Sequence, residues 1–321
     1  MSVQSDPENP VPPVVSKPSS IHGRLLLGMI VGTFAGALLC AFSCLVVWAA
    51  PQTGVAVTVP SLLLVPLIIG LVAARIWSPL NLGVVSILVH SLLCTLLAMG
   101  IAAVVFREGV VCLIILSPLL YVSVFAGAFV GRIWFRRDRV NLWLAPGLIL
   151  VVLAEIALRG PHQSVVIDEI RIEAPPSRVW PHVLAFEPIP ESPGYWLFKV
   201  GLPYPTETTN GGDYVGADRA CRFSGNAFFR EKIVEFEPLR RLTFDIVESP
   251  PDPELIGHLD AHRGQFELRD NGDGTTTLIG RTWYSLHVRP AVYFDWWTRE
   301  IFGAVHLRVM RNVKRLAEEH P

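Results

Sequence analysis

The sequence predicts two structural parts, a helical membrane region followed by an α+β domain in which a curved antiparallel sheet wraps around a long C-terminal helix. Two observations lead to this fold class. The 321 residues are 51% hydrophobic and only 17% charged, with a positive mean hydropathy. Residues 1–159 carry nine Lys or Arg and five Asp or Glu, whereas residues 160–321 carry eighteen and twenty-three. We therefore divide the chain into a tail at 1–20, a membrane region at 21–160 and a domain at 161–321.

The first twenty residues contain five prolines and several serines without apolar periodicity, so we expect a disordered tail. Five apolar runs follow, at 25–50, 57–77, 82–106, 109–131 and 142–158. A helix rises about 1.5 Å per residue and the hydrocarbon core is about 30 Å thick, which predicts five membrane-spanning helices, the last of them the shortest. The first run exceeds the roughly 7–15-residue core of a signal peptide, which favours a membrane anchor.

Three glycines in the first run, Gly28, Gly32 and Gly36, recur every four residues. This spacing lets another helix approach closely and could mediate helix–helix association, although glycine is also common in spanning helices in general. His90 and Glu155 are ionisable residues inside the runs. They show neither an internal repeat nor a broken-helix pattern, so a transporter is not favoured.

Aromatic and basic residues predict the orientation. The tryptophans of this half lie at the edges of apolar runs, as expected at the headgroup layer; they are Trp48, Trp77, Trp134 and Trp143. Five spans with a cytoplasmic N-terminus place seven Lys or Arg inside and two outside. We therefore expect a bacterial-type plasma (inner) membrane protein with residues 161–321 outside the cytoplasm. If 142–158 were instead interfacial or re-entrant, as Glu155 allows, the domain would face the cytoplasm.

The second half begins with strand-like alternation in SVVIDEIRIEA, residues 164–174. The segment PPSRVWPHVLAF then predicts a short helix after two prolines. Further strand-like runs lie at 214–223, 226–236, 240–248, 262–270 and 275–287. The last two are separated by DNGDG, whose glycines suit a hairpin turn. These features predict an antiparallel sheet built from hairpins.

After Pro290 the apolar period changes to three or four residues, which is typical of an amphipathic helix. The apolar positions are Trp297, Ile301, Val305, Val309, Val313 and Leu316. Proline near the start and basic residues in the last turns suit the two ends of one long helix. A strand, a short helix, several hairpin strands and a long closing helix together form an α+β arrangement.

Four segments carry a family resemblance by their order: IEAPPSRVWPHV, VGADRACRFSGNAFFREKIVEFEPLRRLTFDI, RGQFELRDNGDGTTTLIGRTWY and VHLRVMRNVKRLAEE. Together they resemble the SRPBCC superfamily, the START-like, Bet v 1-like helix-grip fold that includes polyketide cyclase/dehydrase and lipid-transfer domains. The similarity covers about residues 165–319. It implies an elongated hydrophobic cavity between the sheet and the long helix. It implies no fixed set of catalytic residues, because the superfamily contains both binders and enzymes.

We expect residues of the later strands and of the long helix to line this cavity. The set is Phe223, Glu231, Phe266, Trp283, Tyr284, Phe294, Trp297, Ile301 and His306. Because Trp283 and Tyr284 are adjacent on a strand, only one of them can face the cavity. The short aromatic stretch at residues 283–297 therefore divides between the wall of the cavity and its rim.

The polar residues each allow two interpretations. Glu231 is either a cavity acid or a charged cross-strand neighbour on the solvent face, and the strand pattern favours the second. His306, at the edge of the apolar stripe, could contact a ligand head or be a hydrogen-bonded core histidine. His258 and His262 have the spacing of helical metal ligands, but they lie where a loop enters a strand, so we expect no metal site.

The sequence contains no GxSxG, HExxH, Walker or glycine-rich dinucleotide motif, so it nominates no catalytic residue. We expect no cofactor and no nucleic-acid partner. The hypothesis is a membrane-tethered domain that binds an apolar ligand, such as a lipid, isoprenoid or polyketide, for transfer or sensing. The alternatives are a cyclase- or hydrolase-type enzyme acting in the same cavity, and a non-catalytic interaction module of a membrane complex.

Overall fold

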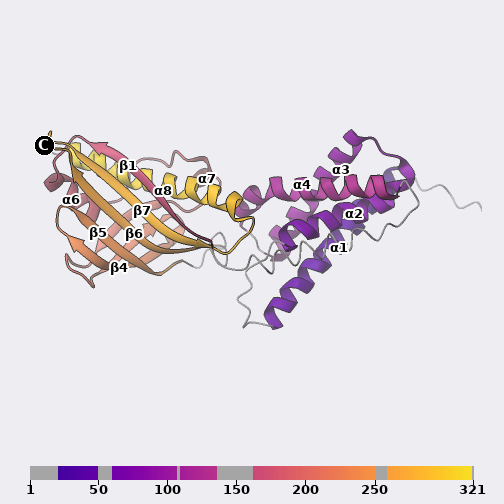
Figure 1. Ribbon diagram of the computed structural model, residues 1–321, viewed down its shortest axis with the longest axis horizontal. Helices are drawn as coiled ribbons and strands as arrows, with labels where there is room; N and C mark the ends of the chain where they lie inside the picture. The colour runs from indigo at the N-terminus through magenta and orange to yellow at the C-terminus, as the bar shows by residue number, and fades with distance from the viewer. Residues whose placement is uncertain (1–20, 50–59, 107–108, 136–161, 251–258, 320–321) are drawn as a thin grey trace, which may run out of the picture.

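The computed structural model describes residues 21–49, 60–106, 109–135, 162–250 and 259–319. Figure 1 shows a helical region and a sheet domain that follow one another along the long axis of the molecule. The predicted tail at 1–20 and the predicted fifth span at 142–158 lie outside the described residues.

Four helices form the first region. They are α1 (Ile21–Ala49), α2 (Val65–Trp77), α3 (Val84–Ile101) and α4 (Val110–Phe135), with π-helical turns at Pro60–Leu64 and Ala102–Phe106. In the described part of the chain, four helical segments are long and apolar enough to cross a membrane. They are Ile21–Ala41, Leu62–Leu80, Val84–Val105 and Val110–Phe135. They correspond to the first four apolar runs of the sequence.

Glycine sets how closely these helices pack. A Cβ atom on Gly70 of α2 would lie 1.9 Å from the carbonyl oxygen of Val124, and one on Gly127 of α4 would lie 1.9 Å from that of Leu67. The two backbones therefore touch at a point where no larger residue fits. The faces of α1 and α2 also meet through glycine, at Gly28, Gly32 and Gly36.

The helices alternate in direction, so the bundle has two distinct ends. At one end the indole of Trp77, the last residue of α2, donates a hydrogen bond to the carbonyl of Leu25 in α1 (3.1 Å). At the same end the Arg75 guanidinium lies over the ring of Phe135, the last residue of α4 (5.5 Å). The starts of α2 and α4 lie at the opposite end, next to the sheet domain (Figure 1).

The sheet domain has seven antiparallel strands in the order β1-β7-β6-β5-β4-β3-β2. They are β1 (His162–Ile172), β2 (Pro205–Asn210), β3 (Asp218–Phe223), β4 (Phe228–Glu237), β5 (Arg241–Glu248), β6 (Leu259–Asp270) and β7 (Thr276–Leu286). Three helices accompany them, α6 (Pro176–Leu184), α7 (Trp196–Lys199) and α8 (Ala291–Glu319), together with a 3-10 turn at Ser224–Asn226. The strands β1 and β3 to β7 agree with the predicted runs, except that β3 begins four residues later than expected.

The long helix α8 lies in the hollow of the curved sheet and contacts β1 and β7 at one edge and β2 at the other. This confirms the predicted sheet wrapped around a C-terminal helix. The predicted hairpin turn between β6 and β7 is also present, since Gly272 and Gly274 adopt positive φ angles of 78° and 82°. In Figure 1 the start of α8 points towards α4 and its C-terminal end points away from the helices.

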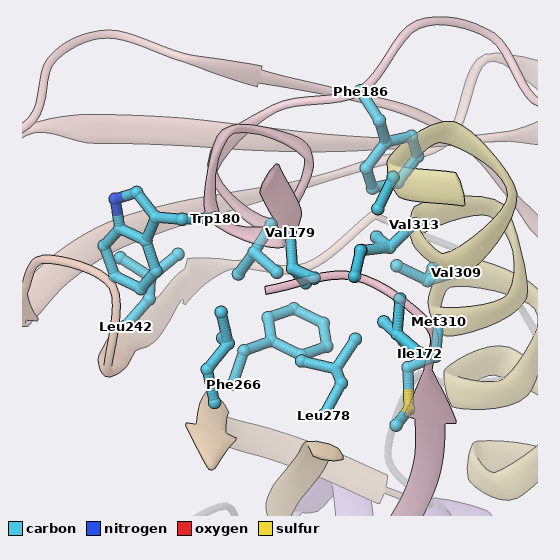
Figure 2. Packing of buried hydrophobic residues seen from close by; sticks show 14 of the residues in the cluster. Ile172, Val179, Trp180, Phe186, Leu242, Phe266, Leu278, Val309, Met310 and Val313 are labelled. Carbon is cyan, nitrogen blue, oxygen red and sulfur yellow. The ribbon is translucent and has the colours of Figure 1, made fainter. Parts of the chain in front are cut away.

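The main core lies between the sheet, α6 and the C-terminal half of α8, and we call it the distal cluster. Figure 2 shows its centre, which consists of Ile172, Val179, Trp180, Phe186, Leu242, Phe266, Leu278, Val309, Met310 and Val313. Each fully buried side chain of this size contributes roughly 1.5–3 kcal/mol to folding. The cluster fixes the C-terminal half of α8 against the sheet, and no described residue of α1 to α4 belongs to it.

Candidate ligand-binding site

A second apolar cluster surrounds the first half of α8, and we call it the proximal cluster. Its buried residues from the domain are Val166, Leu197, Phe198, Leu202, Tyr284, Leu286, Val288 and Phe294. Partly buried residues of α8, including Trp297, Ile301 and Val305, pack against it. The same cluster contains Leu62, Val111 and Ile115 from the helical region. The domain and the helices therefore share one apolar contact.

A polar layer on α8 separates the two clusters. His306, which is 6% exposed, follows Val305 of the proximal cluster and precedes Val309 of the distal cluster. Its Nδ1 lies 2.7 Å from the Asp168 carboxylate of β1, and its Nε2 lies 2.8 Å from the Thr282 hydroxyl of β7. Of the two interpretations of His306, the structure therefore supports a hydrogen-bonded histidine within the domain.

Gly280 of β7 has no side chain, and this leaves room for His306 beside the sheet. Gly280 lies directly opposite Asp168 in the strand register, and a Cβ atom there would be 3.7 Å from Cγ of His306 and 3.2 Å from the sulfur of Met310. With the Asp168 carboxylate ionised, Nδ1–H of His306 donates to it. Nε2 of the neutral ring then accepts from the hydroxyl of Thr282. The layer is an Asp–His–Thr relay in which each group orients the next.

A buried ion pair lies on β3 and β4. Arg219 and Glu231 are register partners, are 3% and 5% exposed, and are joined by a hydrogen bond from Nη1 to the carboxylate. The guanidinium also donates to the carbonyl of Leu184 (3.3 Å) and lies over the ring of Phe244 (4.5 Å). Glu231 shares its face of β4 with the buried Ile233. Of the two interpretations of Glu231, the solvent-facing one is therefore wrong, because the side chain is buried and its charge is matched inside the domain.

Burial dominates the electrostatics of this pair. It raises the pKa of the Glu231 carboxyl above its ordinary value, and the charge and hydrogen bond of Arg219 oppose that rise. Burial likewise raises the pKa of the nearby Cys221 thiol to about 12. The thiol is thus kept protonated at neutral pH and is a poor nucleophile. A buried charge pair costs desolvation energy, so its presence alone is weak evidence that it stabilises the fold, although loss of one partner would be costly.

A third polar group lies at the start of α8. The hydroxyl of Tyr284 donates to Asp295 (2.7 Å), which also accepts from Nε of Arg299 (2.7 Å). Burial raises the pKa of Tyr284 to about 12. Although burial opposes the ionisation of Asp295, hydrogen bonds from Arg299 and Tyr284 hold the pKa of its carboxyl below the usual range. These bonds tie the last sheet strand to the first turns of α8.

The indole N–H of Trp297, near the Tyr284–Asp295–Arg299 group, is a hydrogen-bond donor without an acceptor in the described chain. Its Nε1 is buried and has no hydrogen-bond partner among the described residues. The ring lies between Trp196 of α7 (6.4 Å between centroids) and Trp296 (4.8 Å). Buried N–H groups are almost always paired, so an acceptor on a ligand would complete this site.

The predicted cavity residues do not all lie together. Tyr284, Phe294, Trp297 and Ile301 belong to the proximal cluster, Phe266 belongs to the distal cluster, and Glu231 and His306 are the polar groups described above. Phe223 lies at the end of β3 with its ring 4.9 Å from that of Phe229. Trp283 points away from α8, because its neighbours Thr282 and Tyr284 contact that helix and side chains alternate along a strand. Tyr284 is therefore the inward residue of the adjacent pair.

Residues of the site that the sequence did not reveal include Asp168, Arg219, Thr282 and Asp295. A signal for Arg219 was present, because Arg219 lies at alternate strand positions with Ala217 and Cys221, so the three share one face of the strand. Asp168 likewise shares a face with Ile170 and Ile172. His262 lies 2.7 Å from the hydroxyl of Ser285, and His258 lies outside the described residues. Among the described residues, no group of three or more His, Cys, Asp or Glu could hold a metal ion.

Comparison with known proteins finds one family model that the sheet domain matches. Residues 164–318 match the family described as polyketide cyclase/dehydrase and lipid transport. Solved structures similar to the chain include truncated norcoclaurine synthase from Thalictrum flavum, at 13% identity and a TM-score of 0.36, covering 51% of this chain and 98% of that one. A protein from Nitrosospira multiformis is similar at 18% identity and a TM-score of 0.30, covering 46% and 93%. No curated protein matches the chain.

Proposed function

We propose that the sheet domain binds an apolar ligand between its sheet and α8, because residues 164–318 match the family described as polyketide cyclase/dehydrase and lipid transport. The ligand class is a lipid, isoprenoid or polyketide, and the role is transfer or sensing. One observation carries the proposal: two apolar clusters along α8 are separated by a polar layer. An amphipathic molecule needs both kinds of contact, apolar walls for its chain and fixed polar groups for its head.

The polar groups define the expected head. Trp297 offers an N–H donor, and the Thr282 hydroxyl and the Arg219–Glu231 pair offer further contacts on the inner face of the sheet. The Thr282 hydroxyl and the Arg219–Glu231 pair are held in place by their own hydrogen bonds, so they add little entropy cost to binding. We expect a neutral or singly charged head with at least one hydrogen-bond acceptor.

We propose further that α1 to α4 cross the membrane and hold the domain outside the cytoplasm. The domain contacts the starts of α2 and α4, whereas Arg75 and the end of α4 at Phe135 lie at the other end of the bundle. Basic residues gather on the cytoplasmic side of membrane proteins. His162, at the start of β1, is again at the domain end, 3.6 Å from Asp295.

A reporter enzyme that is active only outside the cytoplasm, fused after Pro321, tests the orientation. We expect activity in whole cells. An otherwise expressed but inactive fusion, combined with activity of a cytoplasmic reporter at the same site, would contradict the proposed side.

Ligand binding is tested with purified full-length protein and an environment-sensitive apolar fluorophore, 1-anilinonaphthalene-8-sulfonate. We expect saturable binding that Trp297→Phe weakens by removing the N–H donor while retaining the ring. Trp283→Phe is the matched control, because Trp283 faces the other side of the sheet. Binding that is not saturable, or that both variants weaken equally, would count against this site.

A second candidate function, hydrolysis of an ester of an apolar substrate, is favoured by the Asp168–His306–Thr282 relay. A carboxylate, an imidazole and a hydroxyl in series can transfer the hydroxyl proton to Nε2 while the oxygen attacks the carbonyl carbon of the ester. The imidazole then returns this proton to the alcohol oxygen as the bond between that oxygen and the carbonyl carbon breaks. A water molecule that gives its proton to Nε2 would release the acid and restore the threonine hydroxyl. The test is turnover of long-chain p-nitrophenyl esters. Thr282→Val should abolish turnover, whereas Thr282→Ser should retain turnover. Equal turnover by the wild type and Thr282→Val would exclude this chemistry.

A further inference from the structure

The end of the domain next to the membrane helices carries large apolar side chains on its surface. Val292 is 84% exposed, Trp296 is 57% exposed and Trp196 is 44% exposed. Val292 and Trp296 are one turn apart on α8, and both Trp196 and Trp296 contact the ring of Trp297. We call these three residues the interfacial patch. Two exposed tryptophans close together are unusual on a surface that meets only water.

The interfacial patch adjoins a contact between the domain and α4. The hydroxyl of Tyr293, which follows Val292, donates a hydrogen bond to the carbonyl of Ile115. The neighbouring Phe294 packs in the proximal cluster with Val111 and Ile115. The first turn of α8 is therefore fixed at the height of Ile115 along α4.

This height is within the predicted membrane span. Ile115 lies five residues after Val110, the start of α4, which is about 7.5 Å along the helix axis. The α3–α4 turn reaches beyond it, and its described side chains Val104, Val105 and Val110 are apolar and exposed. The 26 residues of α4 measure about 39 Å, roughly 9 Å more than the hydrocarbon core. The beginning of α8 thus lies at the level where one leaflet passes from headgroups to acyl chains.

We infer that the interfacial patch inserts into the leaflet in which α4 begins, and that an apolar ligand enters the domain there. Tryptophan prefers this layer because its ring is apolar while its N–H remains hydrogen-bonded. Behind the patch lies Trp297 with its unpartnered Nε1, followed by Ile301 and the polar layer at His306. The entry route rests on the proposed ligand-binding function, whereas insertion of the patch does not depend on it.

Insertion is tested by tryptophan fluorescence of the full chain in nanodiscs made from phosphatidylcholine brominated near the top of its acyl chains. Bromine quenches only tryptophans that it touches. Trp296→Phe should remove one quenched emitter among the nine tryptophans, so the quenched fraction of the total fluorescence should fall. Trp180→Phe, in the distal cluster, should remove an unquenched emitter and so raise the quenched fraction. If Trp296→Phe also raises the quenched fraction, the patch is not in the leaflet.

Entry is tested by the rate at which pyrene-labelled phosphatidylcholine passes from the nanodisc to the domain. Trp296→Glu should slow this uptake about tenfold, as expected when about 1.4 kcal/mol of interfacial binding is lost. Tyr214→Glu is a matched control, since Tyr214 is 61% exposed and lies near Ala217 of the distal cluster. Equal slowing by both variants, or by neither, would overturn the entry route.

The two readouts separate the two proposals. If neither the pyrene lipid nor 1-anilinonaphthalene-8-sulfonate binds the wild type, the ligand-binding function fails, while the bromine result still decides whether the patch inserts. If 1-anilinonaphthalene-8-sulfonate binds Trp296→Glu normally and only uptake from the nanodisc slows, both proposals are supported. Loss of both signals in Trp296→Glu would indicate a damaged domain, and Trp296→Phe then decides through quenching.

Discussion

Removal of one partner from the buried Arg219–Glu231 pair should destabilise the domain in a pH-dependent way. Arg219→Leu leaves the Glu231 carboxylate almost fully buried without its counter-charge. Breaking such a pair typically costs about 3–5 kcal/mol. A protein of this size changes its melting temperature by about 2–4 °C per kcal/mol, so a loss of about 3 kcal/mol predicts a decrease of about 6–12 °C at pH 8.

The sign of the pH dependence follows from the pKa of Glu231. That pKa is raised in the folded state by burial, and in Arg219→Leu nothing opposes the rise. Below the unfolded-state pKa of about 4.3, such an acid is protonated in both the folded and the unfolded protein. Its ionisation therefore costs no stability in that pH range. The loss grows as the pH rises from that value through the raised pKa. The deficit of Arg219→Leu should therefore be smaller near pH 5 than at pH 8.

The assay is thermal unfolding of the detergent-solubilised full chain, followed by intrinsic fluorescence at both pH values. Two controls sharpen it. Arg219→Leu combined with Glu231→Leu removes both charges and should recover most of the stability. Glu231→Gln leaves the arginine unpaired and should be destabilised equally at both pH values. A melting temperature of Arg219→Leu close to that of the wild type at pH 8, or a deficit independent of pH, would refute this account of the pair.

Three further outcomes are expected. Thr282→Val leaves Nε2 of His306 without its hydroxyl partner and should cost about 1–3 kcal/mol in thermal unfolding, whereas Thr282→Ser should unfold like the wild type. Tyr284 should ionise only near pH 12. The wild type and Tyr284→Phe should therefore gain the same tyrosinate absorbance near pH 10, and the wild type should gain more than the variant near pH 12. The stability that its raised pKa provides should be complete below pH 10 and should decline through about pH 12. Gly70→Leu should prevent α2 and α4 from packing and reduce the yield of monodisperse protein, while Gly100→Leu, where a Cβ meets nothing within 4 Å, should not.

Much of the fold could be predicted from local patterns. The period of α8, the hairpin turn at DNGDG and the length of the first four apolar runs each have a direct structural cause, and each was found in the described chain. β2 could not be predicted in this way, because PTETTN is polar and lies at the edge of the sheet, where alternation is not required. The four-residue helix α7 was missed for a similar reason, since one turn is too short to show a period.

The site was less accessible to sequence reasoning because it depends on pairs that are distant in the chain. Glu231 was placed on the solvent face, since an isolated charge on a strand is usually exposed and its partner Arg219 was not recognised. His306 of α8 was identified, but its two hydrogen-bond partners lie on β1 and β7, 138 and 24 residues away in the sequence. The contact between Tyr293 and Ile115 spans 178 residues and joins two regions that composition alone had separated. Strand register and helix placement, which no local pattern encodes, determine all three.

Native mass spectrometry of the full chain, released from nanodiscs of its own membrane lipids, tests most directly whether the domain binds an apolar ligand. We predict an additional mass of an apolar molecule, at one copy per chain, that survives removal of the loosely bound lipids. Trp297→Phe should lower the occupancy of that molecule, and Trp283→Phe should leave it unchanged. A wild-type chain that carries no such mass, or whose bound lipids are the same in both variants, would contradict a ligand site between the sheet and α8.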